Sequence, residues 1–369
     1  MRVVVATDRY PALTSAQAGA TIATAWAELG AQVAVVPLGN ATEGFQQATA
    51  DLLAAGVDMV STDHGLASVV EAMTDGGLVV AIRPDLPLYS GSGIDVEAST
   101  HSLGQLVADL VVAARQRGRV QRIILELADL TSHDGGAGLL EALGATSHTP
   151  LRGGVAELAG IQQIDLEPVL GWLDGATLDL VVPADEAPKH LVGLKGITSV
   201  RGHAAQLDPA FLLATDQSLV DLGSAIAAAL NRPTVATAPG AGAAGGVGQV
   251  VLALGGTVTT GARLGATLAG LERTIAQADL VVTGGGRLDF GTMGGDVLST
   301  MIESATQALR PLVVIAQQNF ISTRELRSIG VEAAYSVRPE TEPAQADAPE
   351  VDAEELLRAA RPVASSWHW

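Results

Sequence analysis

Short runs of apolar, often β-branched residues recur along this chain, and most are followed by a segment with helical spacing. The first run is Val3-Val4-Val5, and a helical pattern follows it over residues 14–29. Continuous apolar runs are typical of strands that are buried on both faces of a sheet. Further runs lie at residues 31–38, 122–125, 178–182, 233–238, 279–282 and 311–316. Strands that alternate with helices predict an α/β fold, with a largely parallel sheet and helices on both faces.

The bulk properties of the chain exclude several classes of protein. A length of 369 residues favours two domains over one ordinary core. The net charge is −19 and no basic run occurs, so nucleic acid is a poor candidate partner. The absence of cysteine excludes disulfides, thiolate metal sites and cysteine nucleophiles. No apolar run predicts a membrane span or a signal peptide, so a cytoplasmic protein is expected.

The turn over residues 283–296 reads TGGGRLDFGTMGGD and joins a predicted strand to a helical pattern. It holds one arginine, Arg287, and one aspartate, Asp289. Glycine turns at the carboxyl ends of strands are where open α/β sheets bind ligands. The segment is therefore either a phosphate-handling site or a tight turn that keeps only the outline of one.

Two acidic residues follow the first two predicted strands. Asp8 comes directly after the first strand, a common position for an acid that binds a metal ion or a hydroxyl group. Glu43 lies in the turn 39–45 after the second strand. It is either an acid near a helix N-terminus or a group of the site, and the sequence leaves both interpretations open.

A second glycine turn, PGAGAAGG at residues 239–246, has the G-x-G-x-x-G pattern at Gly240, Gly242 and Gly245. It is predicted to follow a strand at 233–238 and to precede a helix, which is the context of a dinucleotide-binding turn. No acidic residue ends the next predicted strand, so NAD binding is disfavoured. The glycines either present N–H groups to an anion or permit close packing of helix on sheet.

A third turn, SHDGGAG at residues 132–138, places Asp134 before three glycines and a helical pattern. Asp134 is either a site residue or a turn aspartate that caps the helix. The histidines are scattered and none has the spacing of a metal pair on one helix face, so we assign no metal cage to them. Near the C-terminus, residues 339–350 are acidic and rich in Pro and Ala, which predicts a linker.

Five of these loops, in order, resemble those of the bacterial glycerate kinase (glycerate 2-kinase) family. The resemblance extends from residue 1 to about residue 336. The matching segments are TDRYPALTSA at 7–16, PLGNATEGF at 37–45, LTSHDGGAGLLEALGA at 130–145, PGAGAAGG at 239–246 and DLVVTGGGRLDFGTMGGDVL at 279–298. The fourth segment is identical to the family pattern, and the fifth follows it closely.

The resemblance implies two α/β domains and ATP-dependent phosphorylation of glycerate or another small hydroxy acid, with Mg²⁺. A doubly wound, flavodoxin-like domain would comprise residues 1–79 and 266–336. A second α/β domain would be inserted at 80–265, and residues 337–369 would form an acidic linker and a C-terminal tail. The strand-end turns are expected to meet at one pocket.

The resemblance also implies roles for individual residues. Asp8, Asp134, Arg287 and Asp289 would be catalytic, and Asp8 and Asp289 would be the candidate Mg²⁺ ligands. Asp8 or Asp134 would orient or deprotonate the acceptor hydroxyl, and Arg287 would pair with a carboxylate or phosphate. The residues expected to bind substrate or nucleotide are Glu43, Ser132, Gly135, Gly240, Gly242, Gly245, Gly284 and Gly286.

The chain departs from the family pattern at charged positions. Pro11 and Asp296 stand where the family has lysines, Asn40 where it has an acid, and Gly285 where it has a glutamate. Each unit charge lost at about 4 Å from a phosphate is on the order of 4 kcal/mol at an effective dielectric constant of about 20. Arginines could replace the lost lysines; the candidates are Arg9, Arg83, Arg201 and Arg287.

Three interpretations follow from these departures. The chain is a divergent kinase that remains active, or a catalytically impaired relative that binds a small molecule or acts as a regulatory or scaffold protein. The third is a changed substrate, since Tyr10 and Phe45 add bulk where the family has smaller or more polar groups.

Overall fold

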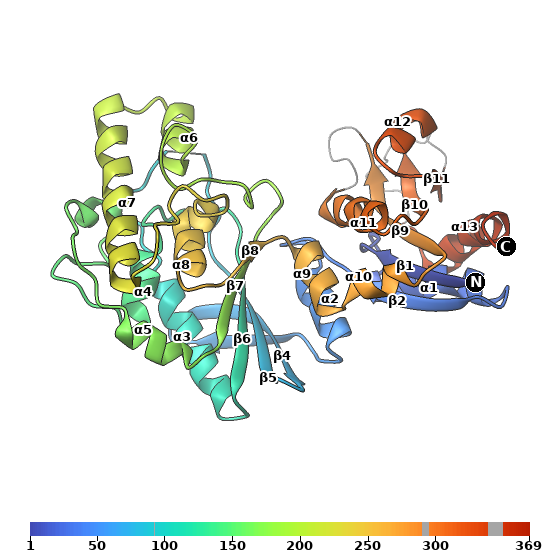
Figure 1. The fold of residues 1–369 in the computed structure, drawn as a ribbon, viewed down its shortest axis with the longest axis horizontal. Coiled ribbons are helices and arrows are strands. Elements are labelled where there is room, and N and C mark those ends of the chain that lie inside the picture. The colour runs from blue at the N-terminus through green and yellow to red at the C-terminus, as the bar shows by residue number, and fades with distance from the viewer. Residues whose placement is uncertain (92, 290–294, 339–349) are drawn as a thin grey trace. The chain divides into compact units, whose positions relative to one another are not determined.

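The computed structural model describes residues 1–91, 93–289, 295–338 and 350–369. The chain divides into two compact units (Figure 1). Unit 1 comprises Met1–Ala55 and Gly261–Trp369, and unit 2 comprises Gly56–Thr260. The predicted linker falls, up to residue 349, outside the described residues. In the part of the chain that the structure describes, no helix has the length and apolarity needed to cross a membrane.

Unit 1 is built on a five-stranded parallel sheet with the order β11-β10-β9-β1-β2. When the five strands are numbered by their order along the chain, the sheet read from β2 has the order 2-1-3-4-5. This is the flavodoxin-like order. The prediction of a doubly wound sheet from both chain ends is therefore confirmed. The strands are β1 (Arg2–Thr7), β2 (Gln32–Pro37), β9 (Leu280–Leu288), β10 (Leu312–Asn319) and β11 (Ala333–Ser336).

Helices cover both faces of this sheet because its central strands are apolar on both sides. Val3 and Val5 face a core formed with α1 and α13, whereas Val4 and Ala6 face a core formed with α10, α11 and α12. The helices of unit 1 are α1 (Ser15–Ala27), α2 (Phe45–Leu52), α9 (Gly261–Leu268), α10 (Leu271–Ala276), α11 (Gly295–Gln307), α12 (Thr323–Ser328) and α13 (Ala353–Ser366).

The C-terminal helix α13 is an integral part of unit 1. Its apolar side, with Leu356 and Ala360 fully buried, packs into the same core as Trp26 of α1. Arg361 forms an ion pair with Glu28, 2.7 Å apart, between the last helix and the first. Trp367 packs against the same core and donates its indole N–H to the Tyr335 hydroxyl at 2.9 Å.

Unit 2 contains a six-stranded sheet with the order β3-β4-β5-β6-β7-β8. The pairs β3–β4 and β4–β5 are antiparallel, and the remaining pairs are parallel. The sheet therefore begins as a meander and continues in the α/β pattern. The strands are β3 (Asp58–Thr62), β4 (Gly65–Thr74), β5 (Gly77–Pro84), β6 (Val120–Glu126), β7 (Thr177–Val181) and β8 (Val258–Thr259).

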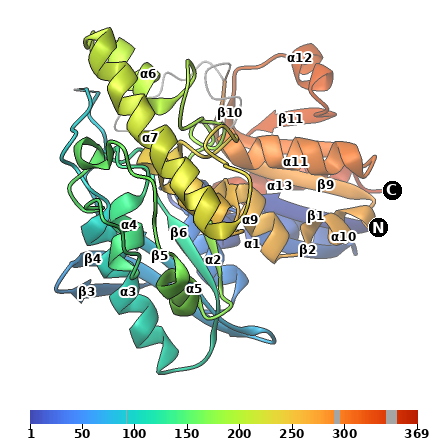
Figure 2. The ribbon, with the colours of Figure 1, turned by 60° about the vertical axis from the view of Figure 1, so that its left-hand side comes forward.

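The long helix α7 and its neighbours close the core of unit 2 (Figure 2). Its buried residues Leu219 and Leu222 join the core that Ile123 and Leu125 of β6 build with α3 and α4. The helices are α3 (His101–Arg115), α4 (Ala137–Ala142), α5 (Glu167–Leu173), α6 (Ile197–Ala204), α7 (Pro209–Leu230) and α8 (Val247–Ala253), with 3₁₀ turns η1 (Val155–Leu158) and η2 (Ala243–Gly246).

The domain bounds and one strand differ from the expectations drawn from the sequence. Residues 56–79 belong to unit 2, because β3 and β4 pair with β5 and not with any strand of unit 1. Residues 261–265 and the expected tail residues 350–369 belong to unit 1. The predicted strand at 233–238 does not form, and the segment runs through turns. Residues 233 and 234 are exposed, and Pro233 has no N–H to give to a sheet.

Candidate active site

The strand order of unit 1 reverses between β1 and β9, and this is the switch point at which doubly wound sheets bind ligands. Two hydrogen bonds join the carboxyl ends of these strands. The Thr7 hydroxyl donates to the Gly284 carbonyl oxygen at 2.7 Å, and the Asp8 N–H donates to the same oxygen at 2.9 Å. The contacts between β1 and β9 thus hold Asp8 against the glycines of β9.

Asp8 is half-buried at this edge, and its carboxylate is held by two donors. Its Oδ1 accepts from the N–H of Arg9 at 2.7 Å, and its Oδ2 accepts from Nδ2 of Asn40 at 2.6 Å. Burial raises the pKa of Asp8 to about 6, although both hydrogen bonds act in the opposite direction. The charge of Glu43 raises that pKa further, whereas the charge of Arg9 lowers it.

Asn40 begins a tight loop that closes on itself after β2. Its carbonyl oxygen accepts from the N–H groups of Glu43 and Phe45, both at 3.1 Å, and Gly44 takes a left-handed φ of 105°. Glu43 is exposed at the tip of this loop. The side-chain oxygen of Asn40 is buried and has no hydrogen-bond partner among the described residues. The loop therefore presents an amide oxygen and a carboxylate near Asp8.

Gly284, Gly285 and Gly286 lie within strand β9, which continues to Leu288, so the turn expected from residue 283 onward does not begin there. A Cβ on Gly284 would collide with the Ile315 carbonyl and the Tyr10 hydroxyl, and one on Gly285 would lie 3.3 Å from the Asp8 Cβ. A Cβ on Gly286 would meet nothing within 4 Å. The strand is therefore closely packed at Gly284 and open at Gly286, where a ligand has room to approach the backbone.

Arg287 and Asp289 lie at the end of the same strand. Their side chains form an ion pair at 2.8 Å, and the Arg287 guanidinium lies 4.6 Å from the centre of the Phe320 ring. The Arg287 side chain is 56% exposed. A small cavity runs beside this strand, and it is lined by residues 283–288 with Leu298, Val314 and Ala316. Residues 290–294 of the turn lie outside the described residues.

In unit 2, Asp134 is fully buried and its carboxylate is saturated with hydrogen bonds. The donors are the N–H groups of Thr100, Gly136 and Gly138, at 2.8–3.0 Å, together with the hydroxyls of Thr100 and Ser99. Burial raises the pKa of Asp134, and these hydrogen bonds lower it. The geometry is that of a turn aspartate that organises the start of α4.

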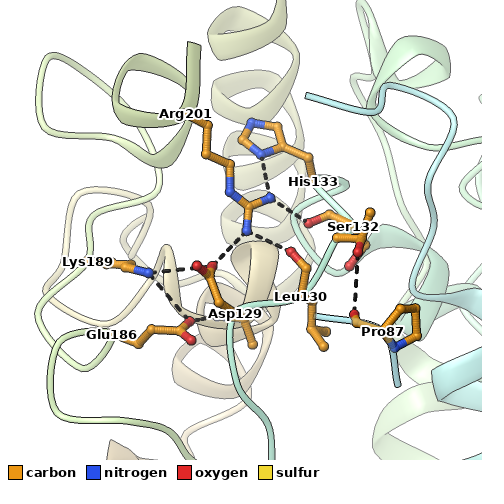
Figure 3. A network of polar contacts seen from close by, with 10 residues as sticks. Pro87, Asp129, Leu130, Ser132, His133, Glu186, Lys189 and Arg201 are labelled. Carbon is orange, nitrogen blue, oxygen red and sulfur yellow. Dashed lines mark hydrogen bonds and ion pairs between the residues drawn. The ribbon is translucent and has the colours of Figure 1, made fainter. Parts of the chain in front are cut away.

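A buried arginine fixes the segment before Asp134. Figure 3 shows Arg201 of α6 reaching Asp129, Leu130 and Ser132, and its guanidinium donates to their oxygens at 2.9, 2.7 and 3.1 Å. The guanidinium also lies 4.2 Å from the centre of the Tyr89 ring. Nothing in the sequence around Arg201 marks it as a structural centre. The Ser132 hydroxyl is buried without a hydrogen-bond partner among the described residues.

His133 completes this network from the opposite side of Arg201. One ring nitrogen lies 2.9 Å from the Thr198 hydroxyl, and the other lies 3.4 Å from the Arg201 guanidinium. Burial, with a smaller contribution from the Arg201 charge, lowers the pKa of His133 to about 3. His133 is therefore neutral at neutral pH and acts as a packed polar residue. No group of three or more His, Asp or Glu side chains gathers as a metal cage within the described residues.

The glycine turn at 239–246 is buried and packed against unit 2's own backbone. The N–H groups of Gly240 and Gly242 both donate to the Lys189 carbonyl at 3.0 Å, and the Ala244 N–H donates to the carboxylate of Glu186 at 2.8 Å. Side chains at Gly242 or Gly245 would collide with the carbonyls of His190 or Ser132. These contacts favour the packing interpretation over an anion site, and the turn follows no strand.

Gly135 fits between the same elements. Its N–H donates to the Gly245 carbonyl at 3.2 Å, and its own carbonyl accepts from the Gln249 amide at 2.9 Å. The expected site residues are thus divided between the units. Asp8, Glu43, Gly284, Gly286, Arg287 and Asp289 lie at the switch point of unit 1, and Ser132, Asp134, Gly135, Gly240, Gly242 and Gly245 lie in unit 2.

The sequence profile of the glycerate kinase family matches residues 3–368. The chain belongs to the glycerate kinase family. A glycerate kinase of Halalkalibacterium halodurans is 28% identical over 356 residues, which cover 91% of this chain and 90% of the relative. The glycerate 2-kinase of Escherichia coli K12 is 29% identical over 235 residues, or 62% of this chain and 60% of the relative.

The fold also matches a solved structure of this family. A crystal structure assigned as glycerate kinase 2 from Salmonella typhimurium LT2 has a TM-score of 0.75 at 23% identity. The match covers 99% of this chain and 98% of the Salmonella typhimurium chain. The match supports the two-unit α/β fold, and the modest identities agree with a divergent member of the glycerate kinase family.

The departures from the glycerate kinase pattern have physical explanations in unit 1. The side chain of Asn40 donates a hydrogen bond to Asp8. An acid at position 40, as in the family pattern, would instead place a second carboxylate against that of Asp8. Gly285 leaves out a second carboxylate that the family's glutamate would place beside Asp8. Asp296 accepts from the N–H of Ala262 at 3.1 Å, so its charge lies at the N-terminus of α9, where the helix dipole favours it.

The two bulky residues of the first loops are core residues. Tyr10 is fully buried, donates its hydroxyl to the Ile315 carbonyl and packs beneath Gly284. Phe45 is 1% exposed and packs near Gly261. Neither ring is available to enlarge or restrict a substrate pocket, which removes the reason for expecting a changed substrate.

Proposed function

We propose that this protein transfers the terminal phosphoryl group of ATP to a hydroxyl group of glycerate or of a related small hydroxy acid. Membership of the glycerate kinase family supports a glycerate kinase-like activity. The observation that carries the proposal is the position of Asp8, which is held at the switch point of a flavodoxin-like sheet beside the glycines of β9, a segment open at Gly286.

In the proposed reaction, the acceptor hydroxyl oxygen attacks the γ-phosphorus of ATP. The bond from that phosphorus to the bridging oxygen breaks, ADP leaves, and the hydroxyl proton passes to Asp8 or to water. Phosphoryl transfer depends mainly on positioning and on charge stabilisation. Asp8 would orient the hydroxyl, because Asn40 and the Arg9 N–H fix its carboxylate in one direction.

The oxygen donors near Asp8 fit a Mg²⁺ ion, which binds one or two carboxylates and takes its remaining ligands from phosphate and water. Asp8 and Glu43 would hold it, and the buried oxygen of Asn40, which has no partner among the described residues, fits the same role. Asp289 is the weaker candidate because Arg287 neutralises it. Bound Mg²⁺ would neutralise charge that develops on the transferred phosphoryl group.

The substitutions around Asp8 also favour an active site over an abandoned one. Relative to the family pattern, Asn40 and Gly285 remove two negative charges, and Pro11 and Asp296 remove the two positive charges of lysines. The charge near the phosphoryl group is therefore less unfavourable than the loss of the two lysines alone would make it. Asp296 adds no charge that is free to repel phosphate, since a helix N-terminus binds it.

Unit 2 would contribute a rigid framework. The contacts described above would hold its loops in shape; they involve Asp134, Gly240, Gly242 and Gly245. The Ser132 hydroxyl, which has no hydrogen-bond partner among the described residues, would be available to a ligand. A role for Asp134 as the base is disfavoured, because five donors already use both of its oxygens.

A coupled assay of ADP release with ATP, Mg²⁺ and D-glycerate tests the proposal. Asp8→Asn removes the negative charge and the proton acceptor, and we expect kcat to fall by about 10²- to 10⁴-fold. Asp63→Asn, an exposed aspartate in the turn of the β3–β4 hairpin, is the matched control and should retain wild-type turnover.

Two results would contradict the proposal. Absence of ADP release from the wild type with every small hydroxy acid tested would exclude the kinase activity. A thermal shift with ATP in that case would favour a non-catalytic binding protein instead. Full turnover by Asp8→Asn would leave the activity in place but would exclude the site.

A further inference from the structure

The switch point of unit 1 carries an arginine that forms no ion pair with any described residue. This residue, Arg9, is exposed and directly follows Asp8. Among the described residues, its side chain makes one hydrogen bond, from Nη2 to the Pro11 carbonyl at 3.2 Å. A guanidinium has five N–H donors, so most of its binding capacity is available to a ligand.

The position of the Arg9 side chain is fixed by two loops. Its Cδ lies 3.5 Å from the point where a Cβ on Gly44 would be, so the stem runs along the loop that follows β2. Gly44 has a left-handed φ of 105°, which favours glycine, and the absence of a side chain there leaves this path free. The Pro11 carbonyl holds the guanidinium from the other side, in the loop that follows β1.

Arg287, the other arginine assigned to this edge, is in a different state. Its charge is paired with Asp289 at 2.8 Å, and its planar group lies over the Phe320 ring. An anionic ligand would have to displace Asp289 to use Arg287, whereas Arg9 needs no such exchange. Arg9 also supplies a positive charge two positions from Pro11, which stands where the family pattern has lysine.

We propose that Arg9 binds the carboxylate of the hydroxy-acid acceptor and so determines its specificity; this inference rests on the proposed kinase function. In a small hydroxy acid the carboxylate lies one or two carbons from the hydroxyl. An acceptor whose hydroxyl contacts Asp8 therefore places its carboxylate within reach of the long side chain of the next residue. Arginine suits this role because its two parallel N–H groups match a carboxylate.

Kinetics of Arg9→Ala and Arg9→Lys, with D-glycerate and with glycerol, test the inference. Glycerol keeps the hydroxyls but replaces the carboxylate with a neutral group. For Arg9→Ala we expect the KM for D-glycerate to rise about 10- to 100-fold, the loss typical of a charged hydrogen bond. The KM for ATP should stay within about threefold, and the preference for D-glycerate over glycerol should fall by the same factor as the KM rises.

Arg9→Lys keeps the charge but not the paired donors, so its KM should lie between those of the wild type and Arg9→Ala. Arg324→Ala on α12 is the matched control, because it removes one exposed positive charge from the same unit and should not change either KM. Calorimetric titration of each variant with D-glycerate in the absence of ATP measures the binding step without turnover.

The outcomes separate the two proposals. Turnover with an unchanged KM for D-glycerate in Arg9→Ala would overturn the inference and leave the kinase function intact. A rise in the KM for ATP alone would assign Arg9 to a phosphate and would also overturn it. A wild type that neither binds nor phosphorylates any small hydroxy acid would overturn both.

Discussion

Asp8 and Asp134 both lie in turns next to parallel strands with glycines close by, yet their carboxylates are in opposite situations. Asp8 accepts two hydrogen bonds at a partly open edge, and Asn40 beside it keeps a buried oxygen without a partner among the described residues. Asp134 is fully buried and accepts from five donors. Similar sequence patterns therefore encode a candidate site in one unit and a framework in the other.

Of the tests of this difference between Asp8 and Asp134, the largest expected effect is the loss of stability in Asp134→Ala. The substitution leaves the buried N–H groups of Thr100, Gly136 and Gly138 without their acceptor. We expect the free energy of unfolding to fall by about 3–5 kcal/mol, because each buried donor left without its partner costs about 1–3 kcal/mol. Urea unfolding followed by circular dichroism measures it.

Asp8→Ala is the matched variant for this experiment. Burial disfavours the charged form of Asp8, so its removal should leave the free energy of unfolding unchanged or slightly higher. If Asp134→Ala were stable but inactive, and Asp8→Ala unstable but active, the assignments of site and framework would be reversed.

Within unit 1, two glycines of β9 offer a smaller test of where this strand is open. Gly284→Ala would press a methyl group against the Ile315 carbonyl, and we expect a loss of about 1–3 kcal/mol in stability. Gly286→Ala meets nothing within 4 Å and should change stability by less than about 0.5 kcal/mol. Thermal unfolding of both variants measures this difference, and equal losses would contradict an open strand edge at Gly286.

The stability of unit 2 should also depend on pH through the buried His133. The pKa of His133 is lowered to about 3 in the folded state, whereas an unfolded histidine titrates near about 6.5. Between these values the unfolded chain binds a proton that the folded chain does not, so stability falls as the pH decreases below 6.5 and levels off above it. The slope from this residue is about 1.4 kcal/mol per pH unit.

His133→Asn removes this contribution and leaves the carboxylates unchanged. We expect its stability to decline less steeply than that of the wild type between pH 6.5 and pH 4.5, as measured by urea unfolding at a series of pH values. Parallel decline of the two proteins would show that His133 is protonated in the folded state at these pH values.

The fold could largely be predicted from the sequence, because the apolar runs and the helical spacing are local signals. The parallel sheet of unit 1 and its discontinuous origin follow from such runs together with the family resemblance. The meander of β3 and β4 was missed, because β3 has no buried residue and the buried residues of β4 are interrupted by half-buried ones, so neither strand has a continuous buried run. The prediction of a strand at 233–238 was wrong, because the apolar residues of this segment lie in turns.

The candidate site was predictable only in part. The sequence indicated Asp8 and the glycine turn of β9, but the role of Asn40 as a donor to Asp8 depends on a contact across 32 residues. Arg201 and Glu186, which organise the loops of unit 2, depend on similar long-range contacts.

The position of β1 between β2 and β9, in a sheet that is completed only by β9, β10 and β11, has a consequence for synthesis on the ribosome. Roughly 240 residues separate the end of β2 from the start of β9, which at about 5–20 residues per second is a delay of roughly 12–50 s. During this interval the nascent β1 has an unpaired apolar edge, while the continuous unit 2 emerges whole. We therefore expect chaperones to bind the first 55 residues, and unit 2 to become resistant to proteases first.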